Sequence, residues 1–386
     1  MIKKIIRLKF HIPQFLIDEI SSKIFYVNHL IEKTQFHSDN VLNIFFKENI
    51  SKKKFIQIEN NINKLVKKLI LKPKEPQKNI LYSRKKNKYT NSFDLRKILL
   101  KNGEIFKEIE GVYVLGNKLT KLNNFFDKKL LSISEKYKAV EYSFPSLMSI
   151  DKLNKVGHFD NFPQSCCFAG HLKEEYELIN KFKIKEKNNL GSKTFLKAAL
   201  SPTVCQHLYF LLSNKHLKKN FIATAKSDCF RYESKNMNSL ERTWNFNMRE
   251  LIILGDQNYV LNKLNKIQKD IINLLDEFEI SYVVESANDP FFEGNYNDLI
   301  TYQNAFKLKY EVRADTPYNK STVAIGSFNN SQNIFGKKLN IKLKNKYINS
   351  ACIGFGFERF AYCFVSQHGL NVKKWPKKIK KYIKNE

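Results

Sequence analysis

The sequence has 386 residues, enough for one large hydrophobic core and a smaller second domain. Hydrophobic residues make up 42% of the chain, as in ordinary folded proteins. No run of about 18 apolar residues occurs, which excludes a transmembrane helix. The basic N-terminus interrupts its apolar run with charged residues, unlike a signal peptide. We therefore expect a cytoplasmic protein with no membrane partner.

The formal net charge of +30 ordinarily indicates a polyanionic partner. Only eight of the 67 basic residues are arginines, however, and Lys, Asn and Ile are abundant along the whole chain. This pattern is typical of compositional drift in an AT-rich genome, which we favour over nucleic-acid binding. Against such a background the arginines are informative, because only arginine grips phosphate or carboxylate with a planar fork. Five of them lie after residue 230: Arg231, Arg242, Arg249, Arg313 and Arg359.

Residues 1–110 are interpreted as a basic, mainly helical N-terminal region, because residues 15–34 and 58–71 carry apolar residues at helical spacing. Two polar stretches with proline or dense charge, residues 72–78 and 84–91, favour a solvated loop or linker.

From residue 111 onward, short strands alternate with longer helices. A strand at 111–115 precedes a helix at 119–137 and a strand at 139–145 that ends in Pro145. The apolar positions of residues 259–278 have the spacing of an amphipathic helix. Further strands are predicted at residues 281–285, 305–312 and 321–326.

A hairpin is predicted from Phe230 to Ile253, with residues 234–243 as its loop. Side chains alternate along a strand, so Arg231 and Glu233 share one face, as do Phe246 and Glu250 on the returning strand. A surface hairpin with ordinary charge pairs is the alternative.

A second segment, Cys352 to Phe360, contains Gly354 and Gly356, where the backbone can approach a ligand closely, followed by Arg359 in the first turn of a helix. Together with the hairpin it resembles motifs 2 and 3 of the class II aminoacyl-tRNA synthetases. The resemblance implies an α+β catalytic domain over residues 111–386, with an antiparallel sheet flanked by helices. The helix and the strand that ends at Pro145 resemble motif 1, which implies a homodimer.

The resemblance implies ATP as a substrate, bound with Mg²⁺. Arg231 can neutralise the α-phosphate, Glu233 can accept a hydrogen bond from the adenine amino group, Phe246 can stack on the base, and Arg242 can reach another phosphate. Arg231 and Arg359 are the expected catalytic residues, and Glu311 is a candidate Mg²⁺ contact. The remaining ATP contacts that the resemblance implies are Thr243, Lys309 and the backbone of Val323, Ala324, Ile325 and Gly326.

Within class II, the chain resembles the amino acid:[carrier protein] ligases, which are related to the atypical seryl-tRNA synthetases of methanogens. The residues that carry this resemblance are 142–147, 159–163, 200–209, 246–250, 288–292, 308–311, 327–329 and the motif 3 segment. Asn330-Ser331 departs from the family, which more often has an aromatic residue and histidine there. Only 27 residues follow Arg359, too few for a C-terminal anticodon-binding domain.

The family resemblance implies a zinc ion held by Cys205, Glu250 and Cys352, with the fourth position open to the substrate's amino group. Glu250 therefore also counts as a substrate-binding residue. Without the resemblance, Cys205 and Cys352 would be interpreted as buried structural cysteines, because the six cysteines have no C-x-x-C spacing.

The favoured reading is an ATP-dependent, AMP-forming ligase that activates glycine, alanine or serine. It then transfers the aminoacyl group to the phosphopantetheine thiol of an acidic carrier protein, and tRNA charging is not expected. A zinc-dependent seryl-tRNA synthetase is the alternative. A non-catalytic paralogue is a third, which the presence of Arg231, Glu233 and Arg359 disfavours.

Overall fold

The structure is a computed structural model that describes residues 1–70, 79–85, 93–184, 194–237, 239–287 and 308–385. These residues form two compact units, Met1–Gln77 with Glu233–Asn238, and Lys78–Tyr232 with Ser239–Glu386. The division near residue 77 differs from the expected one near 110. The reason is that β4 (Ile80–Arg84) pairs with β14 (Tyr282–Ser286) and so belongs to the sheet of the second unit.

The first unit is a three-stranded antiparallel sheet with two helices. Its strand order is β1-β3-β2, and the middle strand contributes the buried residues Leu42, Ile44 and Phe46. The elements in chain order are β1 (Ile2–Arg7), α1 (Ile17–Ile24), β2 (Ile31–Ser38), β3 (Val41–Phe46) and α2 (Lys52–Ile70).

The expectation of a mainly helical N-terminal region was wrong. The helix predicted over residues 15–34 ends at Ile24, and the chain then enters β2, which pairs with β3. Asp39 and Asn40 separate these two strands, as in a tight hairpin, and cross-strand packing overrides the helical spacing of the residues before them. The second predicted helix is confirmed as α2.

The second unit is built on an eight-stranded sheet in the order β4-β14-β15-β16-β19-β13-β12-β7. All its pairings are antiparallel except that between β7 and β12. The predicted hairpin is confirmed, with β12 and β13 as its strands. The bounds are β7 (Val140–Tyr142), β12 (Phe221–Phe230), β13 (Asn245–Gly255), β15 (Lys309–Thr316), β16 (Ser321–Gln332) and β19 (Asn349–Gly356).

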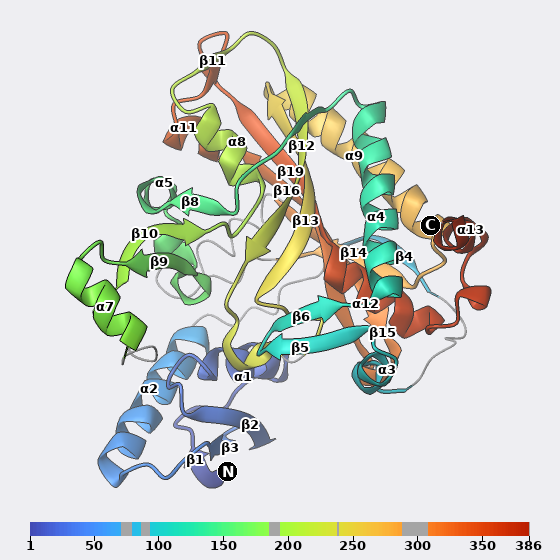
Figure 1. Ribbon diagram of the computed structural model, residues 1–386. Helices are drawn as coiled ribbons and strands as arrows, with labels where there is room; N and C mark the ends of the chain where they lie inside the picture. The colour runs from blue at the N-terminus through green and yellow to red at the C-terminus, as the bar shows by residue number, and fades with distance from the viewer. Residues whose placement is uncertain (71–78, 86–92, 185–193, 238, 288–307, 386) are drawn as a thin grey trace. The chain divides into compact units, whose positions relative to one another are not determined.

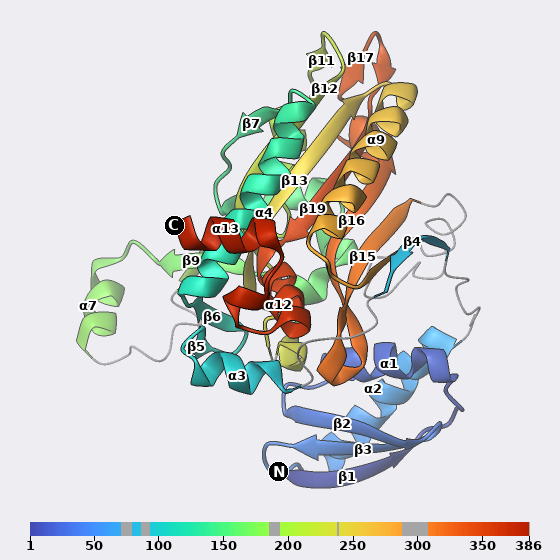
Figure 2. The same ribbon diagram turned by 90° about the vertical axis from the view of Figure 1, so that its right-hand side faces the viewer.

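Three helices cover one face of this sheet: α4 (Asn117–Lys136), α9 (Gln257–Glu277) and α12 (Phe357–His368) (Figures 1 and 2). They bury the odd-numbered residues of β13 and β19, among them Leu251, Ile253 and Ile353. The amphipathic helix predicted at 259–278 and the helix predicted at 119–137 are thereby confirmed. Also in this unit are α3 (Leu95–Lys101), the hairpin of β5 (Ile105–Ile109) and β6 (Val112–Leu115), and the C-terminal α13 (Lys377–Asn385).

The opposite face of the sheet carries the even-numbered residues Ile252, Leu254 and Cys352, which form a separate apolar cluster with helix α8 (Cys205–Leu211). The same unit contains a small sheet of β8 (Leu147–Ser149), β9 (Phe168–Leu172) and β10 (Thr194–Leu200). Its short helices are α5 (Ile150–Lys155), α6 (His158–Asn161), α7 (Tyr176–Ile184) and α11 (Ile334–Lys338), and its short strands are β11 (His216–Leu217), β17 (Lys342–Leu343) and β18 (Lys346–Tyr347). Within the described part of the chain, no helix is long and apolar enough to cross a membrane.

Candidate active site

One face of the eight-stranded sheet, which we call the site face, carries Glu250, Cys352, Lys309 and Glu311 among the residues singled out in the sequence. Strand pairing aligns Glu311, Ser327, Gly354 and Glu250 in one row across four strands. Directly paired residues project from the same face of a sheet, so two carboxylates flank a floor of small residues. This row defines the centre of the candidate site.

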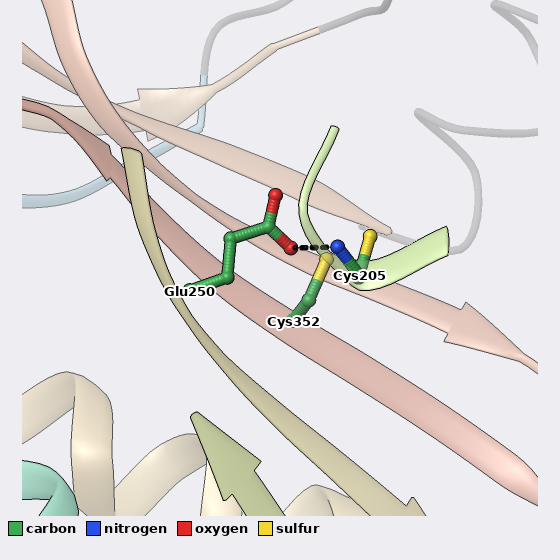
Figure 3. Close-up of side chains that lie close together, drawn as sticks. All are labelled: Cys205, Glu250 and Cys352. Carbon is green, nitrogen blue, oxygen red and sulfur yellow. Dashed lines mark hydrogen bonds between the residues drawn. The ribbon is translucent and has the colours of Figure 1, made fainter. Parts of the chain in front are cut away.

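Glu250, Cys205 and Cys352 form a compact cluster at one end of this row (Figure 3). Their ligand atoms all lie within 4.8 Å of one another, and the three residues are buried. Helix α8 begins at Cys205, and its first residues are held against the sheet by Glu250. The Glu250 carboxylate accepts hydrogen bonds from the main-chain N–H groups of Cys205 (3.1 Å) and Val204 (3.3 Å).

The chemistry of this cluster fits Zn²⁺. Two thiols and a carboxylate are good zinc ligands, and a three-ligand site leaves a fourth position open. The neighbouring Cys352 thiol and burial both raise the pKa of Cys205, and burial raises the pKa of Glu250. A bound dication would offset both effects, because metal ligands must be deprotonated.

Gly354 keeps the floor of the site open. It lies opposite Glu250 in the pairing of β13 with β19. A Cβ added at Gly354 would lie 3.2 Å from the Met248 sulfur and 3.2 Å from Glu250 Cγ. A side chain here would require Glu250 and Met248 to shift by a few tenths of an ångström, which favours a glycine at this position in the strand.

Arg231 and Phe246 meet on the site face, as the sequence predicted. The Arg231 guanidinium carbon lies 5.3 Å from the centre of the Phe246 ring, and its Nε donates a 3.0 Å hydrogen bond to Pro202 O. β12 ends at Phe230, one residue before Arg231, but the Arg231 main-chain N–H still bonds to Trp244 O. The arginine is therefore fixed at the mouth of the hairpin rather than within its strands.

Lys309, Glu311 and Arg313 form a charged row along β15. Glu311 accepts from Arg313 Nη1 at 2.9 Å and lies 3.5 Å from Lys309 Nζ. Burial by itself would raise the pKa of Glu311, but the charges of Lys309, Arg313 and Arg359 outweigh it and lower the pKa. Arg359, in the first turn of α12, is thus electrostatically coupled to this row.

The loop that joins β12 to β13 contains residues of both units. Arg242 is exposed and Thr243 is buried, and the charges of Arg242 and Arg359 both act on Glu241. Glu233, by contrast, begins the segment 233–238, which belongs to the first unit, and its main-chain N–H donates to Met237 Sδ. The expected extended geometry of Arg231 and Glu233 on one strand face is absent, because the strand ends before them.

The predicted backbone contacts at residues 323–326 lie on β16. Val323 and Ile325 direct their side chains into the helix-covered core. Gly326 is required for packing, since a Cβ there would lie 2.5 Å from the Phe355 ring. The motif segment at 288–292 lies outside the described residues.

Two histidines near the site are held neutral. Burial, and then the charge of Arg231, lower the pKa of His158 to about 4; burial, and then Lys152, do the same for His207. His207 Nε2 lies 3.0 Å from Ser201 Oγ, but the Ser201 hydroxyl donates to Thr203 O. Because Ser201 is fully buried, this pair shapes the segment before Cys205 and is no nucleophile.

Sequence reasoning missed Glu358, the residue before Arg359. Its carboxylate accepts from the Asn247 main-chain N–H with both oxygens, at 3.0 and 3.1 Å. Burial raises its pKa to about 7, and the Asp228 carboxylate adds to the effect. The Phe-Glu-Arg triplet was the only signal in the sequence.

Comparison with known proteins agrees with this geometry. Residues 183–368 match the family model "tRNA synthetase class II core domain (G, H, P, S and T)". A type-2 serine–tRNA ligase of Methanococcus maripaludis is 26% identical over 261 residues, 63% of this chain and 50% of that protein. Amino acid–[acyl-carrier-protein] ligase 1 of Bradyrhizobium diazoefficiens is 27% identical over 249 residues, 61% of this chain and 74% of that protein. The chain thus spans about half the length of the serine–tRNA ligases it matches.

Solved structures show the same fold. M. kandleri SerRS, in complex with A. aeolicus tRNASec, aligns with a TM-score of 0.72 at 16% identity, over 99% of this chain and 77% of that one. Seryl-tRNA synthetase from Pyrococcus horikoshii, complexed with ATP, aligns with a TM-score of 0.60 at 15% identity, over 86% and 80% of the two chains. The predicted α+β fold with an antiparallel sheet flanked by helices is confirmed for the catalytic domain.

Proposed function

We propose that this chain, whose residues 183–368 match the class II tRNA synthetase core domain, activates a small amino acid with ATP to form an aminoacyl-adenylate. The observation that supports an amino acid as substrate is the buried cluster of Cys205, Glu250 and Cys352 beside Arg231 and Phe246. When bound there, Zn²⁺ supplies a Lewis-acidic open position for the substrate's α-amino group. Glycine, alanine and serine are the proposed substrates.

In the proposed reaction, a carboxylate oxygen of the amino acid attacks the α-phosphorus of ATP and pyrophosphate leaves. Arg231 neutralises the charge that develops on the α-phosphate, and Phe246 stacks on the adenine. Arg359 binds the outgoing phosphates, with Lys309, Arg242 and Thr243 as further contacts. The backbone of residues 323–326 borders the nucleotide, and Glu311 would hold the Mg²⁺ that accompanies ATP.

The proposed acceptor is the phosphopantetheine thiol of an acidic carrier protein. Its sulfur attacks the adenylate carbonyl carbon, a thioester forms and AMP leaves. This acceptor is supported by the two carrier-protein ligases of B. diazoefficiens, of which the match covers 71% and 74%. The lysine-rich composition also favours an acidic partner.

Seryl-tRNA synthesis is the second candidate. It is favoured by the folded α/β unit at Met1–Gln77, which is more than the two helices expected from the sequence, and by the alignment of 99% of the chain with M. kandleri SerRS. In either case we propose a cytoplasmic homodimer, formed through α4 and β7 as the resemblance to motif 1 implies.

Pyrophosphate exchange tests the first half-reaction. Purified protein is incubated with ATP, radiolabelled pyrophosphate and glycine, alanine or serine, and label entering ATP is counted. Exchange that depends on one of these amino acids supports the proposal, and its absence with all three contradicts it. The acceptor is then identified by offering holo-carrier protein and tRNA in parallel.

A further inference from the structure

Glu358 connects the two motifs of the candidate site through the main chain. It is the second residue of α12, directly before Arg359, and its carboxylate reaches the peptide that joins Phe246 to Asn247. Glu358 of motif 3 thus holds the backbone next to Phe246, the residue of motif 2 that is proposed to stack on the adenine.

This contact replaces a main-chain hydrogen bond that the sheet lacks at the end of β19. β13 pairs with β19 from Gly255 down to Met248, which lies opposite Gly356, and there β19 gives way to α12. Asn247 is the next residue of β13, so its N–H on that side has no strand to bond to. The Glu358 carboxylate takes the place of the absent carbonyl, and a buried N–H left without an acceptor would be destabilising.

Charged residues of both signs surround Glu358. Asp228 and Lys226 act on it from β12, and the Asn247 side-chain amide donates to Asp228 Oδ1. Lys226 in turn lies 3.4 Å from Asp127 of α4, a residue that also binds Arg249. Asn247 is therefore held on both sides, by Asp228 through its side chain and by Glu358 through its backbone.

We propose that Glu358 is a positioning residue for ATP: it fixes Phe246 and Arg359 in one rigid arrangement, so that the base and the phosphates are gripped at the correct separation. The amino acid site at Cys205, Glu250 and Cys352 lies farther along the strands and does not use this contact. Loss of Glu358 therefore weakens ATP binding and leaves amino acid binding unchanged. The inference rests on the proposed function for its nucleotide.

Three variants test this. In Glu358→Ala the acceptor is lost, and we expect the KM for ATP in pyrophosphate exchange to rise roughly tenfold with the KM for the amino acid unchanged. Glu358→Gln retains an acceptor oxygen and restores the KM for ATP to within about twofold of the original protein. Glu277→Gln, at a partly exposed glutamate of α9 that pairs with Lys378, is the matched control.

Calorimetric titration with ATP alone separates this inference from the proposed function. A tenfold loss of ATP affinity in Glu358→Ala, reversed in Glu358→Gln, supports positioning even if no amino acid drives exchange. Unchanged ATP affinity in Glu358→Ala overturns it. Equal losses for ATP and amino acid, or an equal loss in both Glu358 variants, also overturn it, because they indicate general damage rather than positioning.

Discussion

Glu250 and Cys352 lie on neighbouring strands two residues out of register: Glu250 is opposite Gly354, and Cys352 is opposite Ile252. Both side chains therefore project from the same face of the sheet, diagonal to each other. Cys205 reaches them from the first residue of α8, where Glu250 accepts its main-chain N–H. The glutamate is thus a structural acceptor and a candidate metal ligand at once.

The first prediction concerns this cluster. Freshly purified protein is expected to contain about one zinc ion per subunit, measured by atomic emission. Cys205→Ala and Cys352→Ala should lose the zinc and the amino-acid-dependent exchange, because two ligands cannot hold the ion or the amino group. Cys363→Ala, at a buried cysteine in the helix-covered core, is the control that keeps both. Zinc-free protein with full activity would refute the assignment.

Arg231 and Arg359 are expected to act on the adenylation step. Each change to Ala should slow exchange by on the order of 10²-fold, as expected for the loss of a preorganised charge donor. Arg84→Ala is the control, since Arg84 is the last residue of β4 and its side chain contacts Asp276 and Ile280 O rather than any proposed ATP ligand. Wild-type exchange rates in both site variants would exclude the synthetase-like mechanism.

Arg249 should behave differently from these arginines. It lies on the opposite face of β13, where its guanidinium binds Asp127 and Glu141 and its side chain is 4% exposed. Arg249→Ala removes the closest partner of Asp127, which is 17% exposed and keeps Lys226 at 3.4 Å, so we expect a loss of about 1–3 kcal/mol in the free energy of unfolding, measured with urea. The KM values of the folded fraction should not change; a selective rise in the KM for ATP would place Arg249 in the site instead.

The spacing of apolar and polar residues predicted the elements that form from neighbouring parts of the sequence. The β12–β13 hairpin and α9 follow from alternation and helical spacing, and the odd number of Arg249 already places it away from Phe246 and Glu250. The N-terminal sheet was missed because the spacing of residues 15–34 fits a helix until β3 is available to pair with β2.

The site depended more on resemblance than on pattern. Cys205 is 45 residues from Glu250, and no spacing rule connects either of them with Cys352. Only the strand register brings them together. The role of Glu358 could not be predicted either, because its partner is a main-chain N–H 111 residues away.

The raised pKa of Glu358 predicts that the stability difference between the original protein and Glu358→Gln depends on pH. Its pKa is about 7 in the folded chain against 4.5 ordinarily, so its contribution to stability is present below pH 4.5 and is lost as the pH rises through 7. Glu358→Gln cannot ionise and keeps its stability. Its Tm should exceed that of the original protein by a few degrees at pH 8, and the difference should vanish near pH 4.5. Differential scanning fluorimetry across this range measures it, and a Tm difference that does not change with pH would contradict the prediction.

The last prediction concerns the acceptor. After activation, the labelled aminoacyl group should appear on holo-carrier protein as a thioester that hydroxylamine cleaves, and apo-carrier protein, which lacks the thiol, is the control. A protein with a net charge of +30 attracts an acidic carrier by long-range electrostatics, so loading should slow as salt rises from 50 to 300 mM (about 14 to 6 Å in Debye length). Non-specific tRNA binding would weaken with salt too, so salt dependence alone does not identify the acceptor. Charging of tRNA with serine at about 0.15 M salt, with no loading of the carrier, would establish the seryl-tRNA synthetase alternative.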